Sequence, residues 1–100
     1  MKVEWSESAS SDLEAIRAYI ARDSRYYAAS FIRHIVESTR LLGEFPDLGQ
    51  VVREFDRRIV REKVLRNYRI LYEIQKNRVV IIAIVHAARN LDSIALPERN

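Results

Sequence analysis

The sequence predicts a single α+β domain in which an antiparallel helical hairpin packs on one face of a mainly antiparallel, four-stranded sheet. Three observations lead to this prediction. Apolar residues recur at helical spacing before residue 44, strand-like patterns follow after residue 50, and a loop with both Pro and Gly separates the two halves. A chain of 100 residues is long enough to bury a core, so residues 1–100 are interpreted as one domain.

The chain is predicted to begin with a short strand over residues 2–5 and a first helix that runs to about Arg22. Ser6 or Ser8 can cap this helix, because a serine oxygen accepts a hydrogen bond from a backbone N–H group of the first turn. The apolar stripe of the helix recurs at helical spacing. It consists of Ala9, Leu13, Ile16 and Ile20.

A second helix is expected to begin after Asp23-Ser24, which interrupts the first pattern and offers a new cap, and to end at Gly43. Its apolar stripe consists of Ala28, Phe31, Ile32, Ile35, Thr39 and Leu42. Because the connection is short, the two helices are expected to lie antiparallel. Both apolar stripes are then expected to be buried against the same face of the sheet.

Three strands joined by short turns are predicted after the loop, as a β-meander. Residues 58–65 and 68–74 have the alternating pattern of strands, and in residues 68–74 Tyr and Ile alternate with Arg, Leu and Glu. Arg66-Asn67 and Lys76-Asn77 can form the turns. The Tyr/Ile row of residues 68–74 is expected to meet the helices. Arg69 then lies on the opposite face, which we expect to be partly open.

The last predicted strand, residues 79–85, is fully apolar and rich in β-branched side chains, which is typical of a central strand covered on both faces. It brings His86, and shortly afterwards Arg89, to the end of the sheet. Two interpretations of His86 stay open. It can hydrogen-bond at the rim of the core, or it can act as an acid or base, since the unperturbed pKa of histidine is about 6.5.

Positive charge is concentrated in the strand-forming half of the chain. The whole chain has a net charge of +3, whereas residues 50–89 carry ten Lys/Arg against four Asp/Glu, a balance of +6. This asymmetry predicts an acidic partner, either nucleic acid or an acidic protein segment, although basic strands also prevent edge-to-edge aggregation. For Arg69 two interpretations stay open: it can bind the target, or it can pair with Glu62 or Glu73 inside the fold. The candidate binding residues are Arg53, Arg57, Arg58, Arg61 and Tyr68.

Several classes of protein are excluded by the composition. The chain has no cysteine, which excludes disulfides and thiolate metal sites, and the lone His34 of the second helix makes no metal site. Its apolar runs are far shorter than the about 20 residues that a membrane span needs, and the N-terminus lacks a secretory pattern. We therefore expect a cytoplasmic protein without metal, cofactor or membrane association.

Short segments spread along most of the chain are similar to those of one known family. They are Trp5-Ser6-Glu7 with Ala9, Asp12-Leu13, Ile16 and Tyr19, then Phe45-Pro46 with Gly49, Val52-Arg53-Glu54, Asn67-Tyr68-Arg69-Ile70-Leu71-Tyr72, and Ile84-Val85-His86 with Arg89 and Leu91. With these segments in this order, the chain resembles the RelE/ParE family, the toxin half of type II toxin–antitoxin modules. The resemblance implies a growth-inhibiting protein that forms a heteromeric complex with a cognate antitoxin encoded beside it.

This family divides by target. The ending His86-Ala87-Ala88-Arg89-Asn90-Leu91 is more similar to the ParE-like branch, whose characterised members poison DNA gyrase by protein contact, and we predict that function. The RelE-like branch cleaves messenger RNA on the ribosome without metal. In that alternative His86 would be the catalytic acid or base, and Arg69 and Arg89 would hold the phosphate charge.

A nuclease of that kind commonly has a further tyrosine, histidine or lysine near the scissile phosphate, often close to the C-terminus. This chain has no Tyr or His after His86 and no Lys after Lys76. A third interpretation is a non-catalytic module that binds nucleic acid, for which strong, salt-dependent affinity would be the signature.

Overall fold

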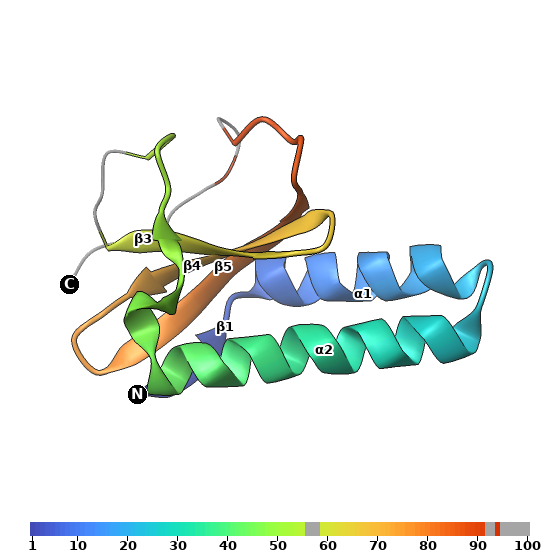
Figure 1. Ribbon diagram of the computed structural model, residues 1–100, viewed down its shortest axis with the longest axis horizontal. Coiled ribbons are helices and arrows are strands. Elements are labelled where there is room, and N and C mark those ends of the chain that lie inside the picture. Colours follow the sequence, from blue (N-terminus) through green and yellow to red (C-terminus); the bar gives the residue numbers. More distant parts are fainter. Residues whose placement is uncertain (56–58, 92–93, 95–100) are drawn as a thin grey trace.

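The computed structural model describes residues 1–55, 59–91 and 94, and it confirms the predicted α+β class. Two helices lie side by side below a sheet (Figure 1). In chain order the elements are β1 (Lys2–Trp5), α1 (Glu7–Ala21), α2 (Arg25–Glu44), the 3₁₀ helix η1 (Pro46–Leu48), β2 (Gln50–Val51), β3 (Val60–Leu65), β4 (Tyr68–Ile74) and β5 (Arg78–His86).

Serine side chains cap both helices, as the sequence predicts. The Ser6 hydroxyl accepts a hydrogen bond from the Ala9 amide at 3.0 Å, and the Ser24 hydroxyl accepts one from the Tyr27 amide at 3.0 Å. The expected end of α2 at Gly43 is wrong by one residue, because the helix continues to Glu44. A Cβ atom on Gly43 would lie 2.7 Å from the Met1 carbonyl oxygen, so this glycine gives β1 room to approach α2.

The sheet has five strands in the order β1-β5-β4-β3-β2, in which β1 is parallel to β5 and the other pairs are antiparallel. The expected number of four is one too few. The strand that was missed, β2, has only two residues, which pair with Arg61 and Glu62 of β3. So short a segment has no periodicity of its own, and only its pairing makes it a strand.

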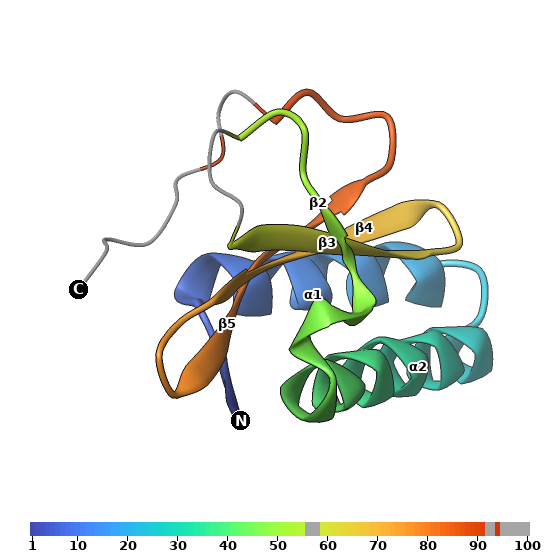
Figure 2. The ribbon, with the colours of Figure 1, turned by 60° about the vertical axis from the view of Figure 1, so that its left-hand side comes forward.

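Both faces of the sheet are covered, each by a different kind of structure. The helices bury the first face, whose largest fully buried side chains include Ile35, Leu42, Ile70, Tyr72 and Ile81. The second face was expected to be partly open, and this expectation is wrong. Val52 of the loop after β2 and Leu91 of the segment after β5 pack there against Leu71, Ile82 and Val85. Figure 2 shows these two segments on the side of the sheet opposite to the helices.

A bulge in β5 changes which faces its side chains occupy. Leu71 pairs with Ala83 and Tyr72 pairs with Ile81, so Ile82 is the extra residue on β5. Side chains of the first helical segment bind this irregular stretch. The Ser6 hydroxyl donates to the Ile82 carbonyl oxygen at 2.9 Å, and the Asp12 carboxylate accepts from the Ile84 amide at 2.9 Å. These bonds replace pairing with β1, which ends at Trp5.

Candidate functional site

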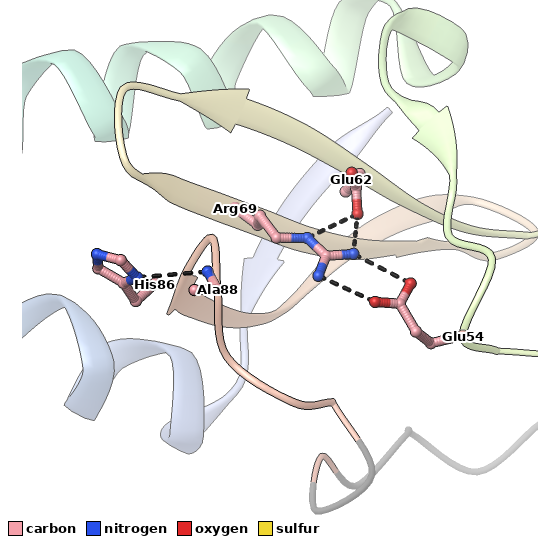
Figure 3. A network of polar contacts seen from close by, with 5 residues as sticks. All are labelled: Glu54, Glu62, Arg69, His86 and Ala88. Carbon is pink, nitrogen blue, oxygen red and sulfur yellow. Dashed lines mark hydrogen bonds and ion pairs between the residues drawn. The ribbon is translucent and has the colours of Figure 1, made fainter.

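Arg69 lies on the face of the sheet opposite to the helices, between two carboxylates. Its guanidinium donates to Glu54 at 3.1 and 3.2 Å and to Glu62 at 2.8 Å, with a second, closer contact to Glu62. Figure 3 shows this arrangement, in which Glu54 comes from the loop after β2 and Glu62 from β3. The Arg69 side chain is only 11% exposed. The ion pair with Glu62 was one of the predicted alternatives, whereas the ion pair with Glu54 was not predicted.

The electrostatics of this cluster favour the charged forms of Glu54 and Arg69. Hydrogen bonds from Arg69 hold the pKa of the Glu54 carboxyl below its usual range, and the two carboxylates raise the pKa of Arg69. A buried guanidinium needs such partners, because an unpaired charge in the interior is costly. The cluster therefore fastens the loop after β2 to the sheet.

His86 lies on the other face of the sheet. It is the register partner of Tyr68, while Arg69 is the partner of Val85, and paired residues of neighbouring strands point to the same face. The imidazole contacts the Tyr68 ring edge-on with centroids 5.9 Å apart, and its Nδ1 accepts a hydrogen bond from the Ala88 amide at 3.3 Å. Figure 3 shows the imidazole turned away from Arg69. Because Arg69 and His86 point to opposite faces of the sheet, a single phosphate group of an RNA cannot contact both side chains.

The other predicted site residues are distributed over several places. Arg89 is exposed, and its amide donates to the His86 carbonyl oxygen at 2.9 Å in the turn after β5. Arg61 is held inside the fold, because its guanidinium donates to the Gly49 carbonyl oxygen at 2.7 Å and lies 3.5 Å from Asp47. Arg53 is exposed. Arg57 and Arg58 lie outside the described residues.

The predicted excess of positive charge is partly compensated within the fold. Arg61, Arg69 and Arg78 each have a carboxylate partner, and the partners of Arg61 and Arg78 come from the N-terminal half of the chain. Within the described ranges, the cations of residues 50–89 without a carboxylate partner are Arg53, Lys63, Arg66 and Lys76. The charge available to a partner molecule is therefore smaller than the sequence indicates.

Tyr68 is half-buried and lines a hollow between the helical hairpin and the turn that joins β3 to β4. This hollow has a volume of about 350 Å³ and is lined by Ile20, Tyr27, Phe31, Arg66, Asn67 and Tyr68. Of these residues, only Tyr68 was predicted as a binding residue. Tyr27, Phe31 and Arg66 were missed because they come together only in the folded chain, since Tyr27 and Arg66 are 39 positions apart in sequence.

Two further properties concern metal ions and membranes. Within residues 1–55, 59–91 and 94, no three His, Cys, Asp or Glu side chains come together as a metal ion would require. Over the same part of the chain, neither helix combines the length and the apolar character that crossing a membrane demands.

Two comparisons with known proteins give a match, one to a sequence family and one to a fold. The model of the family described as "ParE toxin of type II toxin-antitoxin system, parDE" matches residues 3–91. A chain of the chromosomal ParDE TA system from P. aeruginosa has a similar fold, with a TM-score of 0.71 and 22% sequence identity over 86% of this chain and 95% of that chain. A comparison with curated protein sequences found no match.

Proposed function

Because the chain belongs to the ParE toxin family of type II toxin–antitoxin systems, we propose that it inhibits growth by binding and poisoning DNA gyrase. The observation that supports contact with a protein target, rather than RNA cleavage, is the separation of Arg69 from His86. Cleavage of RNA needs an acid or base and a phosphate-binding cation at the same phosphate. Here Arg69, one of the two cations expected in that role, is enclosed by Glu54 and Glu62, and the imidazole lies on the opposite face.

We also propose that a cognate antitoxin neutralises the protein by forming a heteromeric complex with it. Several large apolar side chains are exposed to solvent, which is typical of a surface that another chain covers. They include Tyr19, Tyr26, Tyr27, Val51 and Val64. A segment that folds on binding can cover such a surface as an amphipathic helix or as an added strand.

A brief pulse of expression in bacterial cells tests both parts of the proposal. Growth, transcript 5′ ends and gyrase covalently trapped on DNA are measured in the same cultures, with an early stop codon in the gene as the control. We expect arrested growth, intact messages and trapped gyrase. Expression of the adjacent open reading frame together with this gene should restore growth.

Other results would overturn the proposal in distinguishable ways. New 5′ ends at codon-phased positions within translated messages would establish a ribosome-dependent nuclease instead. Arrested growth with neither cleaved messages nor trapped gyrase would exclude both targets. Failure of the adjacent open reading frame to restore growth would exclude its product as the antitoxin.

A further inference from the structure

Two hollows meet at Arg66, where the turn between β3 and β4 approaches the start of α2. The larger one, of about 350 Å³, has the lining given above. The smaller one, of about 100 Å³, is lined by Tyr26, Tyr27, Ser30, Phe31, His34 and Arg66. Tyr27, Phe31 and Arg66 line both, so a single guanidinium stands between two hollows that contain aromatic rings.

The position of Arg66 is set by the backbone and by aromatic contacts. Its φ of 55° is in the left-handed region, and this residue is the only non-glycine with a positive φ among those described. The guanidinium carbon lies 5.6 Å from the ring centre of Tyr27 and 5.8 Å from that of Phe31. One guanidinium nitrogen donates to the Tyr27 hydroxyl at 2.5 Å.

Arg66 forms no ion pair with an acidic residue of the described part of the chain. By contrast, Arg61, Arg69 and Arg78 each have a carboxylate within ion-pair distance. The ring contacts orient the guanidinium but leave its positive charge uncompensated. A partner can therefore gain a charge-assisted hydrogen bond here without first displacing an internal carboxylate.

We infer that this surface binds a segment of the antitoxin in which two apolar side chains flank a carboxylate. The apolar side chains fill the two hollows, and the carboxylate pairs with Arg66 between them. This inference rests on the proposed function, because it places the antitoxin of that proposal on a particular surface. Charge complementarity selects an acidic segment, and two hollows that share lining residues can take two side chains from one face of a helix, as in other helix-in-groove complexes.

The same geometry argues against nucleic acid as the occupant. Binding of a nucleic-acid backbone needs several cations that follow the phosphates, and its affinity comes mainly from that row of charges. Here one cation lies among Ile20, Tyr27, Phe31 and Tyr68. Apolar walls with a single charge fit amino-acid side chains, which combine both properties in a short segment.

The test measures the affinity of the purified full chain for the purified product of the adjacent open reading frame. Arg66→Asn removes the guanidinium, and asparagine tolerates the left-handed backbone of this turn. We expect the variant to bind at least about tenfold more weakly, because a hydrogen bond to a charged group is lost. Binding by the wild-type chain should also weaken with added salt more than binding by the variant.

Lys76→Asn is the matched control. It removes the same charge from the other tight turn of the meander, where Lys76 is exposed, and it should leave the affinity unchanged. Circular dichroism and thermal unfolding establish that both variants fold. Changing an acidic residue of the partner to lysine should restore binding to Arg66→Glu.

Three results would overturn the inference. Equal affinities of Arg66→Asn and the wild-type chain would exclude this surface as the antitoxin site. If Arg66→Asn binds the antitoxin with unchanged affinity but no longer inhibits growth, the surface binds the target of the toxin instead. If the wild-type chain does not bind the product of the adjacent open reading frame, the proposed toxin–antitoxin pair is wrong, and the inferred surface with it. Failure of the proposed function is thus distinguishable from failure of the inferred surface alone.

Discussion

Arg69 illustrates, at the scale of a single residue, how a suspected catalytic group can be held by the fold. Its neighbours Glu54 and Glu62 occupy the directions in which a guanidinium would bind a phosphate. Binding of a phosphate there would require both carboxylates to leave, and the partly buried Glu62 would then lose its partner. The contacts therefore favour a structural role, in which Arg69 keeps the loop after β2 on the sheet.

The pH dependence of stability tests this role of Arg69. Because the pKa of Glu54 is lowered in the folded protein, its ion pair contributes stability above the unfolded pKa of about 4.3. That contribution is lost as the pH falls through the lowered pKa. We expect the free energy of unfolding of the wild-type chain to fall more steeply between pH 5 and pH 3 than that of Glu54→Gln, measured by urea unfolding.

The control for this measurement is Glu37→Gln. Hydrogen bonds from Arg40 also lower the pKa of Glu37, but this pair is exposed on α2, where solvent screens it. The Glu37 variant should therefore follow the wild-type curve more closely. Parallel curves for Glu54→Gln and the wild type would show that the ion pair between Glu54 and Arg69 contributes no pH-dependent stability.

At the scale of the elements, the β5 bulge is where helix and sheet are joined. β1 ends at Trp5, so the edge of β5 beyond Ile81 has no strand neighbour on that side. Ser6, which caps α1, and Asp12, within α1, bind the exposed backbone groups of this edge. The first helical segment thus satisfies hydrogen bonds that a longer β1 would otherwise make.

Substitution of Asp12 tests this connection. Asp12→Ala removes the acceptor of the Ile84 amide, which then lies unsatisfied beside the core, and should cost about 1–3 kcal/mol of the free energy of unfolding. Asp12→Asn keeps an oxygen at the same position and should cost less. Hydrogen exchange of the Ile84 amide should accelerate in the alanine variant. Equal losses in both variants would assign the effect to charge and not to this hydrogen bond.

For the whole molecule, the sheet separates two environments. The helices, Tyr68 and His86 belong to one side, and Arg69 with its carboxylates and the two covering segments belongs to the other. The aromatic surface around Arg66 lies with the helices. A partner that binds there does not compete with the Arg69 cluster, so binding and local stability can be changed independently.

Variants on the two sides should therefore behave differently in cells. Under the proposed function, His86→Ala should inhibit growth as the wild type does. Arg69→Ala should lose about 3 kcal/mol of stability, because it leaves Glu62 partly buried without its partner, and should inhibit growth only in proportion to the folded protein that accumulates. Growth rate and the amount of protease-resistant protein are measured together. A folded His86→Ala protein without effect on growth would instead support a catalytic histidine.

Most of the local structure is determined by the sequence alone. Short-range hydrogen bonds and side-chain periodicity encode the two apolar stripes, the bounds of β4 and the helix caps. The caps were predicted at Ser6 or Ser8 and at Asp23-Ser24, and they lie at Ser6 and Ser24. The placement of Arg69 on the face away from the helices followed from the same alternation. The family resemblance is carried by these same segments, and the family match confirms it.

Contacts between distant segments were decided only by the tertiary structure. No local pattern indicates that Glu54 reaches Arg69, that Ile82 is a bulge within a uniformly apolar run, or that Arg66 meets Tyr27. Each depends on how whole elements pack, and side chains far apart in sequence become neighbours only after that packing is complete. For this reason the sequence predicted which residues carry charge, while the fold decided which of those charges are available to a partner.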